Sequence, residues 1–259
     1  MGAMDLEPLL RWWRAQDAAF DRVEPAWWGA VVSDARFPAV QEANYARVET
    51  RQPVALAEIE AELGPAMART AGGRSHVVVF HPDAQTDLLS EASTRGERLT
   101  WDLVMAASGP PGAATTGVAV DDVAAFDEIA AEHRDSLRWF GIEDVAVVDQ
   151  LETMERTVMV PAGRRWLAVR ERGRVVALAG LLILEGVGYL DHVVTVPEAR
   201  NRGYASALTA RALAIATASG ADRTYLLAEP DGAAVRMYDR LGFRPVTQIA
   251  SWISPPPAR

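Results

Sequence analysis

A short basic turn between a strand-like run and a helix carries the residue types best suited to chemistry in this sequence. The run 194–196 is followed by this turn and by a helical pattern that starts near Tyr204. A helix N-terminus exposes unpaired backbone N–H groups and the positive end of the helix dipole. Gly203 would let the main chain approach an anion closely, and Arg200 and Arg202 add positive charge. The turn therefore predicts a pyrophosphate cradle, the alternative being an ordinary strand-to-helix turn with solvated arginines.

The composition excludes several other kinds of site. The 259 residues include no cysteine and four histidines, and all 26 basic residues are arginine. Disulfides, thiolate nucleophiles, Cys-ligated metals, Schiff-base lysines and P-loop lysines are therefore ruled out. With so few histidines we also expect no metal site.

The charge balance and the start of the sequence bear on partners and location. The 35 acidic residues exceed the 26 basic ones, for a formal charge of -9, so no global positive field attracts nucleic acid. The first residues lack the segments of a secretory signal, and no apolar run approaches the roughly 18 residues of a membrane span. We therefore expect a soluble cytoplasmic protein without a membrane partner and, by default, without a nucleic-acid partner.

A stretch of small residues with proline and glycine divides the chain. It runs from 107 to 117 and has no apolar periodicity, which is typical of a linker or long loop. A chain of 259 residues is long enough for two domains of roughly 100–150 residues each. We therefore predict an N-terminal α/β domain over 1–107, a linker over 108–117 and a second domain over 118–259.

Apolar spacing predicts alternating helices and strands in the first domain. Helices are expected at 6–17, from about 53 to 69 and from about 83 to 93. Strands are expected at 27–33, 76–80 and 99–106.

The second domain is predicted to begin with helices and to continue as an antiparallel meander. Asp121 or Asp122 is expected to cap a helix that includes Phe126 and Ile129, and a shorter helix follows over 150–156. Strand-like runs then occur at 165–170, 174–184 and 187–196, separated by the turn pairs Arg172-Gly173 and Glu185-Gly186. Helices at 204–219 and 233–241 alternate with strands at 223–228 and 246–253. A meander followed by this alternation predicts a mixed α/β sheet.

Two motifs in this order of elements resemble the GNAT N-acetyltransferase superfamily. Arg200-Asn201-Arg202-Gly203-Tyr204-Ala205 fits that family's Arg/Gln-x-x-Gly-x-Gly/Ala acyl-CoA signature, and 194–197 fits the strand before it. Residues 231–243 are similar to its Asn-x-x-Ala-x-x-Leu-Tyr-x-x-x-Gly-Phe helix. The resemblance covers 118–253. It implies a mixed, mostly antiparallel GNAT-type sheet flanked by helices, with a second, smaller α/β domain at the N-terminus.

The resemblance implies that acetyl-CoA binds at the basic turn as the acyl donor, without a metal. Backbone groups of Val194 and Val196 would pair with the pantetheine arm as an extra strand would. Amides from Arg202 to Ser206 would hold the pyrophosphate, with the Arg200 side chain nearby. The implied cofactor-binding residues are Val194, Thr195, Val196, Arg200, Arg202, Gly203, Tyr204, Ala205, Ser206 and Asp231.

Two positions depart from the signatures. Asp231 stands where the family has asparagine; it serves equally well as a helix cap, but its charge is less welcome beside CoA. Ala205 occupies the second small position, which the signature tolerates. Neither departure removes a needed hydrogen-bond donor.

The resemblance also places Tyr238 beside the thioester sulfur. Its hydroxyl, with an ordinary pKa of about 10, would protonate the leaving thiolate after an amine attacks the acyl carbonyl. The alternative is that the ring packs on Leu241, three residues along the helix.

Three residues are candidates for the base that accepts the proton of the amine. Asp191 and His192 precede the run 194–196, and the two-residue period of a strand puts them on opposite faces. At most one of them can then face the reaction centre. Glu229 ends the next strand. We retain Asp191 and Glu229 as base candidates; each can instead be a solvated strand-end charge, and His192 a core or surface histidine.

The paired signatures predict an N-acetyltransferase that moves acetyl from acetyl-CoA to the primary amine of a small molecule, by direct attack in a ternary complex. The alternatives are a GNAT-like enzyme that uses a longer acyl-CoA or an aminoacyl-tRNA as donor, and a CoA-binding protein without catalysis. The first domain has no cradle motif before its last elements. It is either a degenerate GNAT half that closes the acceptor pocket or an unrelated α/β cap.

Overall fold

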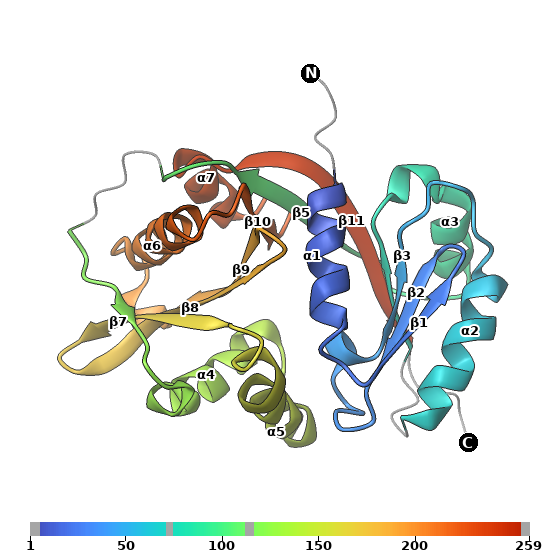
Figure 1. The fold of residues 1–259 in the computed structure, drawn as a ribbon, viewed down its shortest axis with the longest axis horizontal. Helices are drawn as coiled ribbons and strands as arrows, with labels where there is room; N and C mark the ends of the chain where they lie inside the picture. The colour runs from blue at the N-terminus through green and yellow to red at the C-terminus, as the bar shows by residue number, and fades with distance from the viewer. Residues whose placement is uncertain (1–5, 71–74, 112–116, 255–259) are drawn as a thin grey trace. The chain divides into compact units, whose positions relative to one another are not determined.

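The computed structural model describes residues 6–70, 75–111 and 117–254, and the chain divides into two units (Figure 1). Unit 1 consists of Met1–Ala15 and Val104–Val246, and unit 2 of Gln16–Leu103 and Thr247–Arg259. The division after Leu103 lies close to the predicted boundary. The two ends differ from the prediction: Met1–Ala15 are grouped with the second half of the chain, and Thr247–Arg259 are grouped with the first half. Residues 112–116 of the predicted linker lie outside the described residues.

The N-terminal helix α1 (Glu7–Asp17) shows why the start of the chain belongs to unit 1. Helical spacing puts Leu9 and Trp12 on one face, and both side chains are buried. The Trp12 ring stacks on Tyr189 with 4.3 Å between centroids, and its Nε1 donates to the Leu182 carbonyl at 3.2 Å. These contacts join α1 to strands that lie far along the sequence.

Unit 1 contains the predicted meander and the helices around it. Strands β7 (Arg165–Glu171), β8 (Arg174–Leu184) and β9 (Val187–Thr195) are antiparallel neighbours, and β10 (Arg223–Ala228) is parallel to β9. Together with β5 (Thr100–Ala107) and β6 (Asp121–Asp122), they lie in the order β5-β10-β9-β8-β7-β6. The helices are α4 (Ala130–Leu137), α5 (Val145–Met154), α6 (Tyr204–Ala218) and α7 (Ala233–Arg240). Figure 1 shows α6 and the pair α4 and α5 on opposite sides of the meander, which confirms the predicted mixed, mostly antiparallel sheet with flanking helices.

Both hairpins of the meander turn at the predicted residue pairs. Arg172 and Gly173 have φ angles of 50° and 82°, and Glu185 and Gly186 have 50° and 70°. Two central residues in the left-handed region match the twist of the flanking strands, and glycine adopts that region without steric cost.

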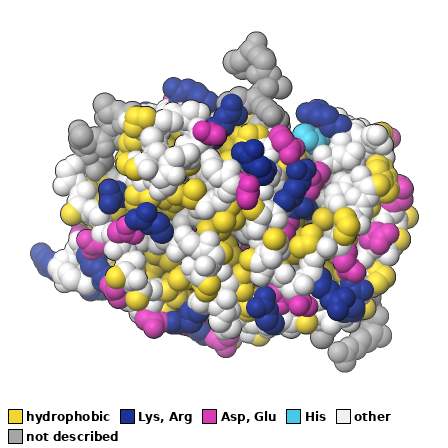
Figure 2. All heavy atoms as spheres, viewed as in Figure 1, with side chains coloured by type: hydrophobic (Ala, Val, Ile, Leu, Met, Phe, Trp, Pro, Cys, Tyr) yellow, Lys and Arg dark blue, Asp and Glu magenta, His cyan; other side chains and the backbone are white. Residues whose placement is uncertain are grey.

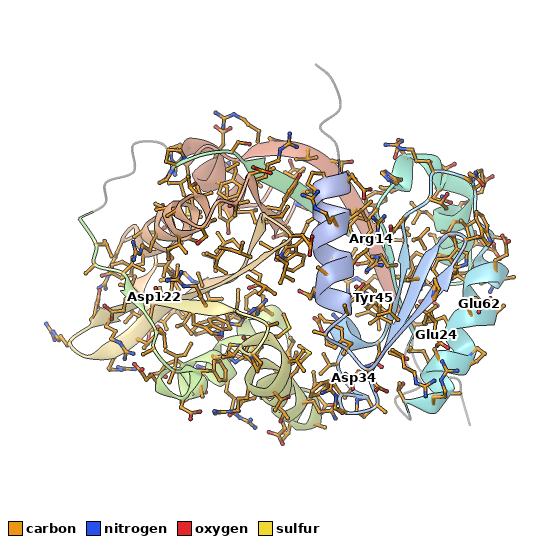
Figure 3. All side chains as sticks on the ribbon, viewed as in Figure 1. Arg14, Glu24, Asp34, Tyr45, Glu62 and Asp122 are labelled. Carbon is orange, nitrogen blue, oxygen red and sulfur yellow. The ribbon has the colours of Figure 1, made fainter. Side chains whose placement is uncertain are left out.

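The start of the second half differs from its prediction. Asp121 and Asp122 do not cap a helix; they form the short strand β6 and pair with Ala168 and Leu167 of β7. Asp122, labelled in Figure 3, also forms an ion pair with Arg165. Helix α4 begins only at Ala130, after a 3₁₀ turn over 126–128. The apolar spacing of Phe126 and Ile129 predicts a helix that starts earlier. It arises instead because these side chains pack into a core with the strands.

Unit 2 is a smaller sheet covered by two helices. Its strands are β1 (Arg22–Ala26), β2 (Gly29–Ser33), β3 (Tyr45–Val48) and β4 (Ser75–Val79), followed in the sheet by β11 (Arg244–Ser254). β1, β2 and β3 are antiparallel neighbours, β3 is parallel to β4, and β4 is antiparallel to the end of β11. The helices are α2 (Leu56–Arg69) and α3 (Thr86–Thr94). Their apolar faces form one core with Trp28, Val77 and Trp252.

Two strands of unit 2 were not predicted. β1 is mostly exposed and contains Pro25, so it shows no alternation of apolar and polar residues. β3 has only four residues, and one of them is Arg47, whose charge conceals the buried strand. Arg47 is only 2% exposed and forms ion pairs with Asp17 and Glu49, while the Tyr45 hydroxyl donates to Asp17 at 2.6 Å.

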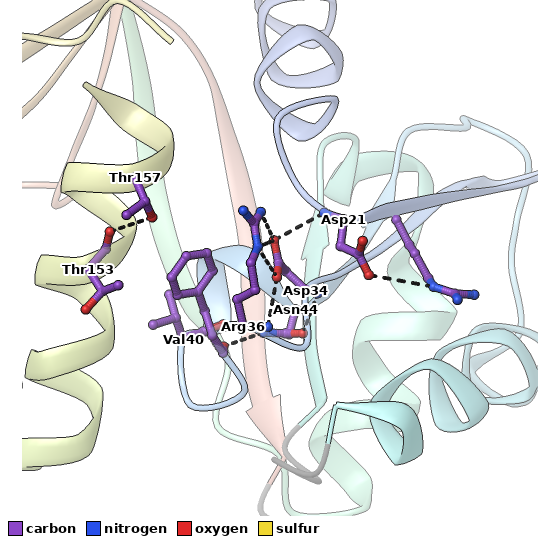
Figure 4. A network of polar contacts seen from close by, with 9 residues as sticks. Asp21, Asp34, Arg36, Val40, Asn44, Thr153 and Thr157 are labelled. Atoms are coloured by element: carbon purple, nitrogen blue, oxygen red, sulfur yellow. Dashed lines mark hydrogen bonds and ion pairs between the residues drawn. The ribbon is translucent and has the colours of Figure 1, made fainter. Parts of the chain in front are cut away.

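The loop between β2 and β3 is held by one buried carboxylate. Asp34 accepts from the Arg36 Nε at 2.9 Å and from the Asp21 amide at 3.1 Å (Figure 4). The Asn44 side chain accepts from the Asp34 amide at 3.0 Å and donates to the Phe37 carbonyl at 2.8 Å. These bonds hold the loop together with its buried side chains Phe37 and Val40.

The two halves of the chain repeat one order of elements. Each runs through a three-strand meander, a helix, a strand parallel to the third, a second helix and a last strand. The last strands are exchanged. Residues 250–254 of β11 pair with β4 in unit 2, and residues 104–107 of β5 belong to unit 1, where β5 lies beside β10. This exchange explains why the end of the chain belongs to unit 2.

Charged side chains of both signs are interspersed over the face seen in Figure 2, with no stripe of one sign. None of the described helices has the length and hydropathy that a membrane span requires.

Candidate active site

Strands β9 and β10 pair along only part of their length. The parallel register joins 187–189 to 223–225, and it gives no further pair between these two strands in the described part of the chain. Farther along β9, Leu178 of β8 faces Val194 whereas Gly180 faces Asp191, so β9 carries one extra residue. His192 lies at this bulge with a φ of 49°. In the described residues, β10 therefore does not pair with β9 beyond Tyr189.

A cavity of about 800 Å³ lies where the two strands diverge. The end of β9, the first turn of α6, one face of α7 and the aromatic pair Trp139 and Phe140 form its walls. All of these residues belong to unit 1. The volume lies within the range of pockets that hold small ligands and cofactors.

The structure brings most of the predicted site residues to this cavity. Those that line it are Val194, Thr195, Arg200, Gly203, Tyr204, Ala205, Ser206, Glu229 and Tyr238. Val196, Arg202, Asp231 and Asp191 were also predicted but are not among the lining residues.

The first turn of α6 has the geometry expected of an anion site. Gly203 is its N-cap and lies in the left-handed region with a φ of 81°, and Asn201 before it has a φ of 62°. The Ala207 amide donates to the Gly203 carbonyl at 3.0 Å, which closes the first helical turn. The amides of Tyr204, Ala205 and Ser206 precede this bond and are the donors that a helix start leaves for a ligand. This end of the cavity can bind an anionic group.

The two arginines of the turn are placed differently. Arg200 is exposed, lines the cavity and donates from Nε to the Thr195 carbonyl at 3.2 Å. Arg202 points to Glu171, with 2.9 Å between Nη1 and Oε1, and the Tyr204 hydroxyl also donates to Glu171. The hydrogen bond from Tyr204 and the charge of Arg202 hold the pKa of Glu171 below its usual value. Glu171 therefore competes with any anion in the cradle for Arg202.

We expect Glu171→Gln to raise the affinity for acetyl-CoA about threefold at low salt, because it removes a negative charge and releases Arg202. Titration calorimetry at two ionic strengths measures the gain, which should shrink as salt screens the exposed charges. Glu198→Gln is the matched control, since it removes the same charge near Arg202 but keeps the Glu198 backbone carbonyl to which Arg202 donates. Equal gains in both variants would contradict a specific role for Glu171.

Tyr238 is buried in the wall of the cavity. It is 6% exposed, and its ring packs edge-on against Phe243 with 5.8 Å between centroids. Burial raises the pKa of Tyr238 to about 12, because the phenolate would lose its hydration. The hydroxyl therefore stays protonated throughout the physiological range, as a proton donor must.

The candidates for the base are placed very differently. Asp191 forms an ion pair with Arg164, and burial raises its pKa despite that partner. Glu229 is exposed at the end of β10 and lines the cavity. The expectation that Asp191 and His192 point to opposite faces is wrong. The bulge breaks the alternation, and His192 packs on Trp166, the ring over which Arg164 also lies.

Asp231 does not have its predicted role as a helix cap. Gly232 is the N-cap of α7, and Asp231 before it is exposed with a φ of 63°. The sequence prediction also missed Trp139 and Phe140, although an adjacent aromatic pair before Gly141 is a recognisable signal.

The equivalent loop of unit 2 has no open cradle. Strands β3 and β4 pair up to Val48 and Val79, and the next amide, of Phe80, still donates to the Val48 carbonyl at 3.0 Å. Residues 49–55 contain no glycine. The buried Gln85 side chain fills this loop: it accepts from the Val54 amide at 3.1 Å and donates to the carbonyls of residues 50 and 52. In this loop, side-chain and backbone bonds within unit 2 already occupy backbone groups that a ligand would need.

Comparison with known proteins bears on the family and the fold. A GCN5-related N-acetyltransferase from Kribbella flavida has a TM-score of 0.65 at 19% identity, over 98% of this chain and 97% of that one. A functionally unknown conserved protein from Staphylococcus epidermidis has a TM-score of 0.67 at 12% identity, over 87% and 90%. A GCN5-related N-acetyltransferase from Sphaerobacter thermophilus has 0.57 at 20%, over 77% and 66%. At these identities the likeness concerns the fold.

The sequence comparison assigns one segment of the chain to a family. No curated protein matches the chain. Residues 126–243 match the profile of the Acetyltransferase (GNAT) family, a segment that lies within unit 1 and includes the meander, the cradle and Tyr238. The match assigns residues 126–243 to the Acetyltransferase (GNAT) family.

Proposed function

We propose that this protein transfers an acetyl group from acetyl-CoA to the primary amine of a small molecule, by direct attack in a ternary complex. One observation carries the proposal: the diverging end of β9, the cradle at Gly203 and the buried Tyr238 all line the same cavity. Each of the three suits a different part of a CoA thioester and its reaction.

The walls of the cavity suggest how the donor is held. The backbone of 194–196 pairs with the amide groups of the pantetheine arm as a neighbouring strand would, in the space that β10 leaves. The amides of Tyr204, Ala205 and Ser206 bind the pyrophosphate, and Arg200 adds charge at the edge of the cavity. The exposed Asp231 is not a lining residue, so its negative charge costs little affinity.

The residues around the thioester account for the proton transfers. Bound acetyl-CoA supplies an activated acyl carbon. The amine nitrogen forms a bond to this carbon, the carbon–sulfur bond breaks, and Tyr238 gives its proton to the departing sulfur. Glu229 is the carboxylate of the cavity wall and accepts the proton that the amine loses, either directly or through water. Asp191 is engaged by Arg164 and is a poorer candidate.

We also propose that unit 2 is a GNAT-like half without a donor site. The repeated order of its elements supports a common architecture, and the Gln85 bonds and the continuous pairing of β3 with β4 argue against a second cradle. Titration calorimetry is expected to give one acetyl-CoA per chain. A stoichiometry of two would contradict this assignment.

The test of the proposed function combines binding with turnover. Acetyl-CoA binding is measured by calorimetry, and acetylated products are then sought by mass spectrometry with a panel of primary amines. Binding together with an acetylated amine supports the proposal. If only a longer acyl-CoA binds, or if acyl transfer occurs only from an aminoacyl-tRNA, that compound is the donor instead of acetyl-CoA. Binding without transfer to any amine would leave a CoA-binding protein.

A further inference from the structure

A buried polar and aromatic group lies on the bulge of β9, away from the cradle. We call it the bulge cluster and define it by its residues: His133, Ser136, Glu155, Arg164, Trp166, Asp191 and His192. They come from α4, the π-helical segment Glu155–Met159 that continues α5, the residue before β7, β7 itself and the bulge. The cluster deepens the proposed function above, on which its role depends.

The hydrogen bonds of Ser136 fix the state of the His192 ring. The Ser136 hydroxyl has one proton and donates it to the His133 carbonyl at 2.6 Å. The same oxygen lies 2.7 Å from His192 Nε2, so it must accept there, and Nε2 must carry the ring proton. His192 is thus held as the neutral Nε2–H tautomer. Burial lowers the pKa of His192 and takes that of His133 to about 4, which lets the two rings stack uncharged at 4.7 Å.

The residue before His192 is held by an independent set of contacts. Arg164 forms ion pairs with Asp191 and with Glu155, and Glu155 also accepts from the Trp166 Nε1 at 2.8 Å. Gly180 on β8 makes room for this arrangement, because a Cβ there would lie 2.6 Å from Asp191 Oδ1. Two consecutive residues of the bulge are therefore tied to three other elements of unit 1.

The cluster borders the cavity in two places. The His192 ring packs on Phe140 with 5.1 Å between centroids, and Phe140 lines the cavity. Val193 and Val194, which directly follow the bulge, line it as well. His192 itself is not a lining residue, so it acts on the site through these neighbours.

We infer that the bulge cluster positions the backbone of 192–194 against the acyl group, with the hydrogen bond from His192 to Ser136 as its lock. The left-handed conformation costs energy at any residue other than glycine, although histidine adopts it more often than most, and contacts such as the bond to Ser136 hold His192 in it. Without the lock, β9 can relax toward regular pairing and turn its N–H and C=O groups away from the thioester. His192 and Ser136 are thus positioning residues, and the cradle at Gly203 does not depend on them.

The first test separates positioning from binding. Ser136→Ala is expected to lower kcat about tenfold and to leave the Kd of acetyl-CoA within about twofold, since only the acyl end is misplaced. Ser136→Thr, which keeps the hydroxyl, is expected to restore most of kcat. Thr70→Ala is the matched control, because the buried Thr70 hydroxyl also donates to the carbonyl three residues earlier, at 3.1 Å to Met67, but in unit 2. A similar loss of kcat in both alanine variants, or no rescue by threonine, would overturn the inference.

The second test does not require turnover. With four histidines in the chain, nitrogen NMR with His192→Asn for assignment can identify the protonated ring nitrogen of His192. The expected result is a single Nε2–H tautomer in the wild type and a mixture of tautomers in Ser136→Ala. A wild type protonated at Nδ1, or a tautomer unchanged in the variant, rules the lock out even if no amine acceptor is found. A wild type with the expected tautomer but no transfer would instead count against the proposed function.

Discussion

Tyr238→Phe is expected to lower kcat about 100-fold and to leave the Kd of acetyl-CoA within about twofold. The substitution removes only the hydroxyl oxygen, and a general acid typically contributes 10²- to 10⁴-fold. The ring stays in place because its contact with Phe243 is made by carbon atoms. Single-turnover kinetics and calorimetry on the same preparation measure the two quantities.

The buried Tyr225 provides the control. It is fully buried in β10, and its hydroxyl makes no hydrogen bond with the described residues. Tyr225→Phe removes the same atom from the same unit and should leave both kcat and Kd unchanged. An unchanged rate in Tyr238→Phe, or equal losses in the two variants, would remove Tyr238 from the mechanism.

The raised pKa of Tyr238 has a consequence for the pH profile. An ordinary tyrosine would lose its proton around pH 10, and the rate would then fall as the pH rises. Because burial raises the pKa to about 12, the protonated form persists above pH 10. Near pH 10 the pH profiles of the wild type and of Tyr238→Phe should therefore have the same shape.

Gly203→Asp is expected to weaken acetyl-CoA binding by a factor of about 100 or more. The added side chain would occupy the space through which the phosphates approach the amides of the first helical turn. Its charge would also repel the phosphates at short range. The variant should fold, because the strain of a residue other than glycine at a φ of 81° costs only about 1–3 kcal/mol and aspartate adopts this region more often than most residues. Calorimetry measures the affinity, and circular dichroism checks the fold.

Gly220 offers a matched control at the other end of the same helix. It has a φ of 79°, and an added Cβ would meet no atom within 4 Å. Gly220→Asp therefore introduces the same side chain and a similar backbone strain away from the cavity. Its acetyl-CoA affinity should equal that of the wild type. Undiminished affinity in Gly203→Asp would defeat the cradle.

The two large effects divide the site into binding and chemistry. Gly203→Asp acts on the end that holds the phosphates, and Tyr238→Phe acts on the end where the carbon–sulfur bond breaks. If the protein binds acetyl-CoA but does not transfer the acetyl group, Gly203→Asp would still weaken binding. Tyr238→Phe would then have no measurable effect, because the wild type would have no transfer rate.

Elements whose signal is local were predicted closely from the sequence. β8, β10 and the start of α6 begin at the predicted residues, because turn pairs such as Arg172-Gly173 and the helix start at Gly203 depend only on neighbouring residues. The proposed cradle is also a local feature. Its amides, its glycine and Arg200 all lie within a few residues of one another.

Features that depend on distant partners could not be predicted in this way. Asp121 and Asp122 pair with β7 across more than forty residues, so their helix-cap pattern was misleading. The bulge at His192 breaks the two-residue period through contacts with α4 and β7, and this places Asp191 with Arg164. The partners of the charged strand residues and of the exchanged strands lie far away in the sequence. The sequence around these residues therefore does not indicate where they pack.

The meander, the glycine turn before α6 and the helix that carries Tyr238 could be predicted from the sequence, since turn chemistry and periodicity are properties of neighbouring residues. The tertiary structure alone decided that β5 and β11 change places between the halves and that Gln85 fills the loop of unit 2. It also decided that burial sets the pKa of Tyr238. Strand pairing, the filling of a loop and desolvation each depend on which residues far apart in the sequence come together. The pattern of neighbouring residues does not specify these contacts.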